Sequence, residues 1–513
     1  MTTLFTTVKK IASENGDRLA LISDEDGSRT YSELVANVAA TAYVLRYELG
    51  LDFGDKLALW GLNRPEWAEI FLACNAIGVG CFPMNTNWTA SEAATILQKA
   101  KVKVLAHDSY LSARANVLAS KVEGLEQLIS TDSSGSLGLK QLQLVAPRDC
   151  ITRLPDPPAN VGAPFFFTSG TSGSRSKAIV RVGNARRMPP MEELFGLTPE
   201  DRTMVVTPFF HGNGNSGLVY TLTYGGSVVF NRRFSANRFW PLVDRHRPTF
   251  LFTLMPILNI LLSREPCSAE AHNSLQKILA LGVAPLLETV EKRFGVRAFD
   301  WYGGTEMGGC VCTPLDEPNR PGSTGKVLPG RTLFILDDNL NVCPPGVTGQ
   351  VAVLRDEVGF GGYADDPEAT AASIAGPYFL TGDLAYIDED GWFFFVDRSK
   401  DIVRRGGENL SSIEVEAVLS RHPAIQEIAV VPRPDTVLGE RVTAVIVPKA
   451  NFVAPDPSAL RAFASKELAR FKIPDLVVTV GELPRTETGK IKKPALKAVI
   501  AEYVRTHGDV VSE

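Results

Sequence analysis

A stretch rich in Ser, Thr and Gly, TSGTSGSRSKAIV from Thr168 to Val180, follows the apolar run APFFF. Glycines let backbone N–H groups approach an anion, hydroxyls add donors, and the cations Arg175 and Lys177 supply charge, so this composition suits a polyphosphate. The spacing from Gly170 to Lys177 differs from that of a P-loop. A flexible surface loop is the alternative interpretation of this segment taken alone.

A second segment, DWYGGTEMGG from Asp300 to Gly309, places an aromatic ring before two glycines and a Thr-Glu pair. The face of Tyr302 can stack on a purine, and the glycines allow a nucleotide to approach closely. Glu306 beside triphosphate oxygens is a reasonable magnesium ligand. A turn with a solvated glutamate is the alternative.

Three further positions carry charges suited to a nucleotide. YFLTGD places Asp383 after a tight Thr-Gly turn, and DRSKD places Arg398 at the end of an aromatic strand. An ionised aspartate can accept from both ribose hydroxyls, and an arginine can donate to the same sugar or its phosphate. PRTETGK holds out Lys490 on a loop, although a solvated basic tail also accounts for this lysine because others follow it.

The chain around these motifs alternates strand-like apolar runs with helical patterns, which indicates α/β sheets covered by helices. A buried strand from Lys56 to Leu62 precedes a helix opened by Pro65. A helix N-capped by Thr89, with Glu92 three residues on, precedes the strand VKVLA. Loop-like composition across residues 130–160 predicts an internal boundary.

Composition excludes several classes of protein. The 513 residues carry 53 Lys and Arg against 58 Asp and Glu, and this balance disfavours disorder, a collagen-like fold and a protein that coats nucleic acid. Seven scattered cysteines suit a reducing compartment, so we expect a cytoplasmic protein. The start lacks signal-peptide features, and Pro256 and Asn259 interrupt the longest apolar stretch, so no transmembrane segment is expected.

Taken together, TSGTSGSRSK, WYGGTE, YFLTGD, DRSKDIVRRGGENLSSIEVE and PRTETGK, in this order, resemble the adenylate-forming superfamily of acyl-CoA synthetases, adenylation domains and firefly-type luciferases. The resemblance runs from TYSEL (Thr30 to Leu34) to Lys493. It implies an α/β fold with a large N-terminal domain of helix-covered β-sheets plus a small β-barrel-like part, and a small mobile α+β C-terminal domain. The implied boundaries are residues 1–397 for the AMP-binding domain, 398–400 for the hinge and 401–513 for the C-terminal domain.

The resemblance also implies a reaction. Members of this superfamily activate a carboxylate with ATP to give an acyl-adenylate and pyrophosphate, and the synthetases then pass the acyl group to a thiol. The implied ligands are ATP, Mg²⁺ and coenzyme A, with a small-molecule carboxylic acid as substrate and no nucleic-acid partner. A stand-alone ligase that loads an acyl carrier protein, a luciferase-like adenylating oxygenase and a nucleotide binder without turnover are the alternatives, and a homodimer is left open.

By analogy with the family, Lys490 bridges the carboxylate and the α-phosphate, and Glu306 binds Mg²⁺ together with Thr168. His211, in PFFHGNGN, is expected between the acyl pocket and the thiol route. Asp383 and Arg398 are expected at the ribose. The other implied positions are the phosphate-loop residues Thr168, Ser169, Gly170, Thr171, Ser172, Gly173 and Lys177, the adenine and α-phosphate residues Gly282, Ala284, Tyr302, Gly303, Gly304 and Thr305, the hinge Lys400, and Gly406 and Gly407 at a pantetheine tunnel.

Two local features refine this analogy. Three residues instead of the family's usual two separate Gly173 from Lys177, so Arg175 or Lys177 is the main cation of the loop. Amino-acid-activating relatives carry an aspartate near FFHGNGNSG, where this chain has no acid, which disfavours an amino acid substrate. The run from Phe230 to Leu262 resembles acyl-CoA ligases of the crotonobetaine/carnitine and fatty-acid kinds.

Overall fold

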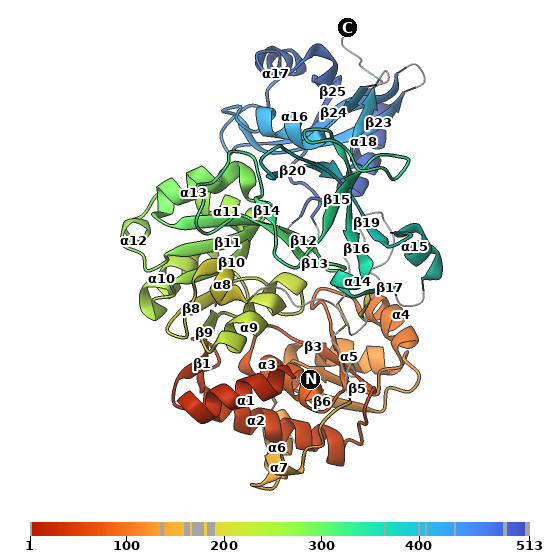
Figure 1. The fold of residues 1–513 in the computed structure, drawn as a ribbon. Coiled ribbons are helices and arrows are strands. Elements are labelled where there is room, and N and C mark those ends of the chain that lie inside the picture. Colours follow the sequence, from red (N-terminus) through yellow and green to blue (C-terminus); the bar gives the residue numbers. More distant parts are fainter. Residues whose placement is uncertain are drawn as a thin grey trace. The chain divides into compact units, whose positions relative to one another are not determined.

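The computed structural model describes residues 3–133, 138–158, 165–166, 179–181, 190–363, 366–398, 401–405, 408–435, 438–485 and 490–507. The chain divides into two compact units (Figure 1). Of the described residues, those within 3–166, 179–332 and 355–372 belong to the larger unit, and those within 333–354 and 373–507 belong to the smaller unit. Within the described residues, no helix is long and apolar enough to cross a membrane.

The main sheet of the larger unit is parallel from β12 through β11, β10, β8 and β9 to β1, and antiparallel strands flank it at both ends. Such a sheet needs helical crossovers, because parallel neighbours cannot be joined by a tight hairpin. The strands, in spatial order, are β14 (Lys326–Val327), β13 (Gly308–Cys312), β12 (Arg297–Gly304), β11 (Lys277–Leu281), β10 (Phe250–Leu254), β8 (Arg202–Val205), β9 (Ser227–Phe230), β1 (Leu19–Ile22) and β2 (Arg29–Thr30). The helices that connect or flank them are α8 (Met191–Phe195), α9 (Gly212–Tyr224), α10 (Ala236–His246), α11 (Met255–Leu262), α12 (Ser268–Ala271) and α13 (Leu287–Phe294).

A second, all-parallel sheet of the larger unit has the strand order β4-β3-β5-β6. The predicted strand and the helix opened by proline are β3 (Lys56–Trp60) and α3 (Pro65–Ala76). Thr89 and Glu92 form the expected capping box of α4 (Ala90–Ala100). The other elements are β4 (Gly80–Pro83), β5 (Val104–His107), β6 (Gln127–Ser130) and α5 (Ser112–Ala119).

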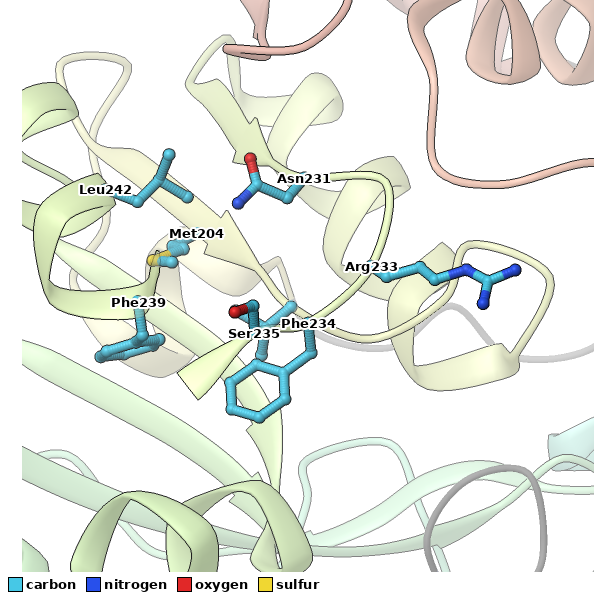
Figure 2. Close-up of a pocket in the computed structure, with 8 residues that line it drawn as sticks. Met204, Asn231, Arg233, Phe234, Ser235, Phe239 and Leu242 are labelled. Carbon is cyan, nitrogen blue, oxygen red and sulfur yellow. The ribbon is translucent and has the colours of Figure 1, made fainter. Parts of the chain in front are cut away.

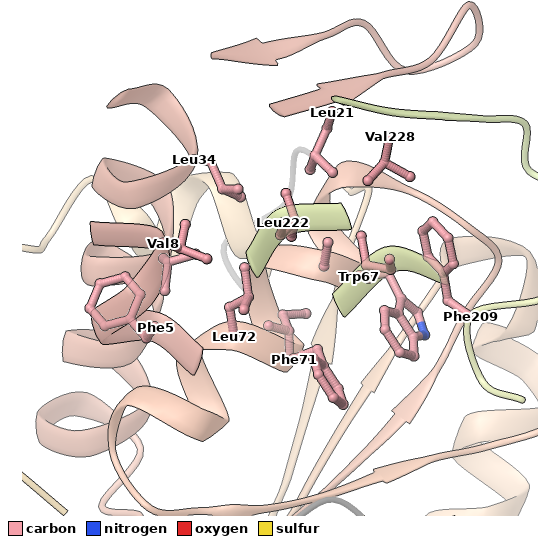
Figure 3. Packing of buried hydrophobic residues seen from close by; sticks show 14 of the residues in the cluster. Phe5, Val8, Leu21, Leu34, Trp67, Phe71, Leu72, Phe209, Leu222 and Val228 are labelled. Atoms are coloured by element: carbon pink, nitrogen blue, oxygen red, sulfur yellow. The ribbon is translucent and has the colours of Figure 1, made fainter. Parts of the chain in front are cut away.

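One large apolar cluster of the larger unit draws on both sheets and on the N-terminal helices (Figure 3). Phe5 and Val8 of α1 (Leu4–Asn15) and Leu34 of α2 (Tyr31–Tyr43) belong to it, as do Trp67 of α3 and Leu222 of α9. Fully burying one side chain of this size contributes about 1.5–3 kcal/mol. The N-terminal helices are therefore part of the scaffold that fixes α9.

The internal boundary predicted across residues 130–160 is wrong. Two short helices, α6 (Leu139–Gln143) and α7 (Cys150–Arg153), lie there within the larger unit. Leu139 and Cys150 are buried in the same cluster as α2. The polar loop composition of this segment reflects its exposed turns, whereas a few apolar residues hold it to the core.

The smaller unit contains a mainly antiparallel sheet and a compact α+β part, in agreement with the predicted fold class. The first sheet is β15 (Leu333–Leu336), β16 (Gly349–Leu354), β19 (Tyr378–Ile387) and β18 (Ile374–Ala375), with β20 (Phe393–Arg398) paired to β19. The second is β22 (Glu408–Leu410), β21 (Val403–Arg405), β24 (Gly439–Pro448) and β23 (Ile425–Asp435), with β25 (Leu476–Thr479) parallel to β24. Helices α16 (Ser412–Leu419), α17 (Pro457–Ala464) and α18 (Lys493–His507) accompany the second sheet.

Candidate functional site

The parallel strands of the main sheet have their carboxyl ends at one edge, and the predicted site residues of the larger unit that the structure describes lie at or just after the ends of β8, β11 and β12. β9 pairs with one side of β8 and β10 pairs with the other, so the strand order reverses at β8. In open α/β sheets, ligands bind outside the carboxyl ends of the strands at such a switch point. The topology therefore predicts a ligand site at this edge independently of any motif.

His211 lies in the turn between β8 and α9, next to the switch point. Its N–H donates to Pro208 O at 3.0 Å, and it stands at the N-terminus of α9. Two residues on, the Asn213 side chain accepts from the Thr207 hydroxyl at 2.6 Å and donates to Thr253 O of β10 at 3.3 Å. These contacts tie the start of α9 to the carboxyl ends of β8 and β10.

The segment after β11 carries Gly282 and Ala284, both expected at the adenine. Gly282 has a φ of +74°, which glycine adopts without the steric cost of a side chain. The Val283 N–H donates to Oδ1 of Asp300 on β12 at 2.8 Å. Burial raises the pKa of Asp300 to about 6, although backbone hydrogen bonds from Val283, Trp301 and Ala284 oppose that rise. Asp300 thus fastens the turn after β11 to the strand that carries Tyr302.

Asp300 was not among the residues that the motifs singled out as functional. Its position directly before Trp301 and Tyr302, and its acidic type within a buried strand, are the signals that could have found it.

The segment WYGGTEMGG forms a hairpin of β12 and β13. The hairpin pairs Gly303 with Gly309 and Gly304 with Gly308. A Cβ on Gly303 would lie 2.2 Å from Gly308 O, and a Cβ on Gly309 would lie 1.9 Å from the Trp301 ring. These two glycines are therefore required by the packing of the hairpin itself, a reason that differs from the predicted approach to a nucleotide.

Glu306 lies in the turn of this hairpin, and its Oε1 accepts a hydrogen bond from the Tyr363 hydroxyl at 3.1 Å. Tyr363 ends β17 (Phe360–Tyr363), which pairs with β7 (Ile179–Arg181). Burial and the Glu306 carboxylate raise the pKa of the Tyr363 phenol, so the phenol stays a proton donor at neutral pH. Tyr363 is a second residue that the motifs did not identify, and its signal was the aromatic ring that ends GFGGY.

The described residues contain no cluster of three or more His, Cys, Asp or Glu side chains that could enclose a metal ion. Mg²⁺ usually retains several waters and binds one or two carboxylates together with substrate phosphates. A single carboxylate held by a phenol therefore fits Mg²⁺ that arrives with a polyphosphate, and it does not fit an all-protein metal cage.

In the smaller unit, the structure brings Asp383 and Arg398 together. They are directly opposite in the β19–β20 pair, and Arg398 Nε lies 3.5 Å from Asp383 Oδ1. The Asp383 N–H donates to the Thr381 hydroxyl oxygen at 3.1 Å, and Gly382 takes a φ of +73° in the intervening residue. The pair presents an acceptor and a donor on neighbouring strands.

Lys490 is exposed in the smaller unit. Arg485 and Ile491, on either side of it in the sequence, form an isolated β-bridge, and the Lys492 N–H donates to Pro484 O at 2.7 Å. The remaining predicted positions lie outside the described residues: Thr168, Ser169, Gly170, Thr171, Ser172, Gly173, Arg175, Lys177, Lys400, Gly406 and Gly407.

Figure 2 shows a small pocket beside this edge, at the carboxyl ends of β8 and β9. Met204, Phe239 and Leu242 make its apolar side, while Asn231 and Arg233 contribute polar groups. None of the predicted site residues that the structure describes lines this pocket, so it is distinct from the site built around Tyr302 and Glu306.

Comparisons with known proteins give a consistent picture. The model of a family described as AMP-binding enzyme matches residues 8–363, and that of the AMP-binding enzyme C-terminal domain matches residues 414–490. The chain is 31% identical to an oxalate–CoA ligase of Arabidopsis thaliana, covering 96% of this chain and 97% of that protein. It is 30% identical to a medium-chain fatty-acid–CoA ligase of Escherichia coli (strain K12), with 94% and 87% covered.

Among solved structures, the chain is similar to ATP-bound MatB from Rhodopseudomonas palustris. The TM-score is 0.87 at 27% sequence identity, and both chains are covered completely.

Proposed function

The chain belongs to the AMP-binding enzyme family, and from this membership we propose how its residues divide the work of an AMP-forming ligase. It is an ATP-dependent acyl-CoA synthetase of the acid–thiol ligase class. A carboxylate oxygen attacks the α-phosphorus of ATP and pyrophosphate leaves. The thiol of coenzyme A then attacks the acyl carbonyl, and AMP leaves with the electron pair of the broken anhydride bond.

The gathering of the predicted residues at the carboxyl ends of β8, β11 and β12, on one edge of the main sheet, is the observation that carries the assignment of the nucleotide site. Tyr302 lies near the end of β12, and the residues Gly282 to Pro285 follow the adjacent strand β11, so we assign the adenine to them. Thr305 is assigned to the α-phosphate. The Asp300 contact to Val283 supports this pairing, because it fixes the two segments relative to one another.

Glu306 is assigned to Mg²⁺, and Tyr363 holds one oxygen of its carboxylate. When bound, Mg²⁺ would screen the phosphate charge that otherwise repels the incoming carboxylate. Thr168 is proposed as its second ligand. The rest of the phosphate loop, Ser169 to Gly173 with Arg175 or Lys177, is proposed to bind the β- and γ-phosphates.

The residues of the smaller unit are assigned to the ribose and to charge neutralisation. Asp383 accepts from ribose hydroxyls, and Arg398, paired with it at 3.5 Å, donates to the same sugar. Lys490 neutralises the carboxylate and the α-phosphate during the first step. Domain alternation about 398–400, with Lys400 as hinge and Gly406 and Gly407 at the thiol route, is proposed for the second step, and His211 separates the acyl and thiol sites.

For the acid, we propose a small molecule that bears a second hydrogen-bonding group. Asn215 Nδ2 and Thr253 Oγ1 are buried without a hydrogen-bond partner among the described residues, and each belongs to an element that ends or begins at the switch point. A buried unsatisfied polar group costs about 1–3 kcal/mol, and a ligand that satisfies it recovers that energy. An acid without such a group, of the fatty-acid or crotonobetaine kind, is the second candidate, supported by the resemblance of residues 230–262.

The test is a panel of acids with ATP, Mg²⁺ and coenzyme A, in which pyrophosphate release is measured with and without the thiol. We expect release with a short acid that carries a carboxylate, hydroxyl or carbonyl besides the reacting group, followed by thioester formation. A Thr253→Val variant should lose roughly 5–10-fold in kcat/KM for that acid and little for an alkyl acid. Faster turnover of alkyl acids by the unaltered protein would contradict the substrate class.

The panel also separates the alternatives for the thiol. Thioester formation on an acyl carrier protein but not on coenzyme A would identify a loading ligase, and the absence of pyrophosphate release with any acid would exclude adenylation. A cytoplasmic location is proposed from the cysteine usage.

A further inference from the structure

A chain of buried polar side chains in the smaller unit joins three segments that are far apart in sequence. It begins at Asp397 near the end of β20, passes through Ser412 at the start of α16, and ends at Lys493, the first residue of α18. Glu416, one turn further along α16, completes the network. The network therefore connects the residue next to Arg398 with a residue three positions after Lys490.

The distances are those of charge-assisted hydrogen bonds. Lys493 Nζ lies 2.8 Å from Glu416 Oε1 and donates to Ser412 Oγ at 2.5 Å. The Ser412 hydroxyl in turn donates to Asp397 Oδ2 at 2.6 Å, and the Ser412 N–H donates to the same oxygen at 2.7 Å. Glu416 Oε1 also accepts from the Val430 N–H at 2.7 Å.

The network is largely removed from water. The side chains of Lys493 and Glu416 are 13% and 20% exposed, and Ser412 and Asp397 are buried. Removing one member of such a pair leaves an uncompensated charge in a poorly solvated place, which is strongly unfavourable. The neighbouring Lys492, by contrast, is exposed.

The chain between Lys493 and Lys490 is short and is held at its middle. Three residues span at most about 11 Å, and Ile491 bridges Arg485 while the Lys492 N–H donates to Pro484 O. The backbone after Lys490 therefore has two supports: the contacts of Ile491 and Lys492 with Arg485 and Pro484, and the anchored ammonium of Lys493. Displacing that ammonium shifts the start of α18 and, with it, the base of the Lys490 side chain.

We propose that Lys493 is a positioning residue for the first half-reaction, because its bonds to Glu416 and Ser412 hold the segment that carries Lys490. This inference rests on the proposed role of Lys490. Through Ser412, the same network reaches Asp397, whose Oδ1 accepts from the Arg398 N–H at 2.7 Å. One buried cluster thereby orders the backbone beside both residues of the smaller unit that are assigned to the nucleotide.

The experiment compares Lys493→Met, Lys493→Arg and the matched exposed control Lys492→Met. Acyl-AMP formation is followed by pyrophosphate release at saturating acid and ATP, thiolysis is measured with supplied acyl-AMP, and Tm is measured for each variant. We expect Lys493→Met to lower kcat for acyl-AMP formation roughly 10–100-fold, the scale of a misplaced reacting group, while thiolysis of supplied acyl-AMP keeps its rate. Lys493→Arg should restore most of the activity, and Lys492→Met should match the unaltered protein.

Ser412→Ala serves as a milder variant if Lys493→Met does not fold, because it leaves Lys493 and Glu416 paired. It should lower acyl-AMP formation roughly 5–10-fold, the equivalent of one lost hydrogen bond, and again spare thiolysis. Equal loss of both half-reactions in these variants would show a structural role only and would overturn the inference.

Lys490→Ala, measured in parallel, separates the role of Lys490 from the positioning role of Lys493. If Lys490→Ala still forms acyl-AMP at the normal rate, the proposed role of Lys490 is wrong. If Lys490→Ala is inactive in that step while Lys493→Met and Ser412→Ala are both fully active, the role of Lys490 stands and the positioning role of Lys493 is wrong.

Discussion

Glu306 and Asp300 lie on or next to a central strand of the main sheet, whereas Lys490 lies on an exposed segment of the smaller unit. In the larger unit, strand pairing and buried hydrogen bonds determine the positions of the side chains at the carboxyl ends of the parallel strands, where the nucleotide is proposed to bind. In the smaller unit, a β-bridge and the Lys493 network hold the backbone near Lys490, whose side chain is exposed.

This difference matches the two kinds of work assigned to the regions. A nucleotide cradle benefits from rigid elements, because small displacements of binding groups are costly. A lysine that acts in only one of two half-reactions needs a stable base and an unhindered side chain. Four predictions, from the largest expected effect to the smallest, test this contrast.

Lys490→Ala should lower acyl-AMP formation by roughly 10²–10³-fold, as expected for the loss of one group that stabilises developing charge. Thiolysis of supplied acyl-AMP should continue, because the lysine is assigned to the first step only. Pyrophosphate release and thioester formation, measured separately, check this. An equal loss in both steps would remove the functional contrast between the regions.

Asp300→Asn should change the pH dependence of stability. The folded-state pKa of Asp300 is raised from 3.8 to about 6, so the folded chain binds a proton between these values that the unfolded chain has lost. The stability of the unaltered protein therefore falls as pH rises through this window, by up to about 3 kcal/mol. Asp300→Asn should lack this slope.

Urea unfolding of both proteins at several pH values from about 4 to about 6.5 measures the effect of Asp300. Asp338→Asn, at an exposed aspartate of the smaller unit, is the control and should leave the slope unchanged. Parallel pH profiles for Asp300→Asn and the unaltered protein would show that burial does not raise the pKa of Asp300 in the folded chain.

Gly309→Ala should destabilise the larger unit by about 1–3 kcal/mol, because the added methyl would overlap the Trp301 ring. Gly282→Ala should destabilise the larger unit by about 1 kcal/mol, because a Cβ at this position meets no neighbouring atom and only the positive φ is unfavourable for alanine. Thermal unfolding distinguishes them. A larger loss of thermal stability in Gly282→Ala than in Gly309→Ala would indicate that the β12–β13 hairpin relaxes around the added methyl group more readily than its close packing suggests.

Tyr363→Phe removes the hydrogen bond to Glu306 and should weaken Mg²⁺-dependent ATP binding by about 1 kcal/mol, or roughly fivefold. Calorimetry of ATP binding with and without Mg²⁺ provides the measurement, and the affinity without the metal should hardly change. If Tyr363→Phe binds ATP as tightly as the unaltered protein does, both with and without Mg²⁺, then Tyr363 does not position Glu306.

The sequence alone identified the family and most of the local structure of this protein. Local chemistry is enough to recognise the capping box of α4 and the proline at the start of α3, because each involves only residues close together in the sequence. The order of the five motifs can likewise be seen directly in the sequence. The loop composition of residues 130–160 led to the wrong prediction of an internal boundary, because local polarity does not reveal that Leu139 and Cys150 pack into a core formed by distant residues.

Only the tertiary structure decided which distant residues support the site. Tyr363 meets Glu306 across 57 positions of sequence, Asp300 meets Val283 across 17, and Lys493 meets Ser412 across 81. Each contact depends on strand order, register and helix placement, which arise from the packing of the whole core and leave no periodic mark in the residues concerned. Short-range chemistry therefore determined the motifs, while long-range packing determined the hydrogen bonds that hold them.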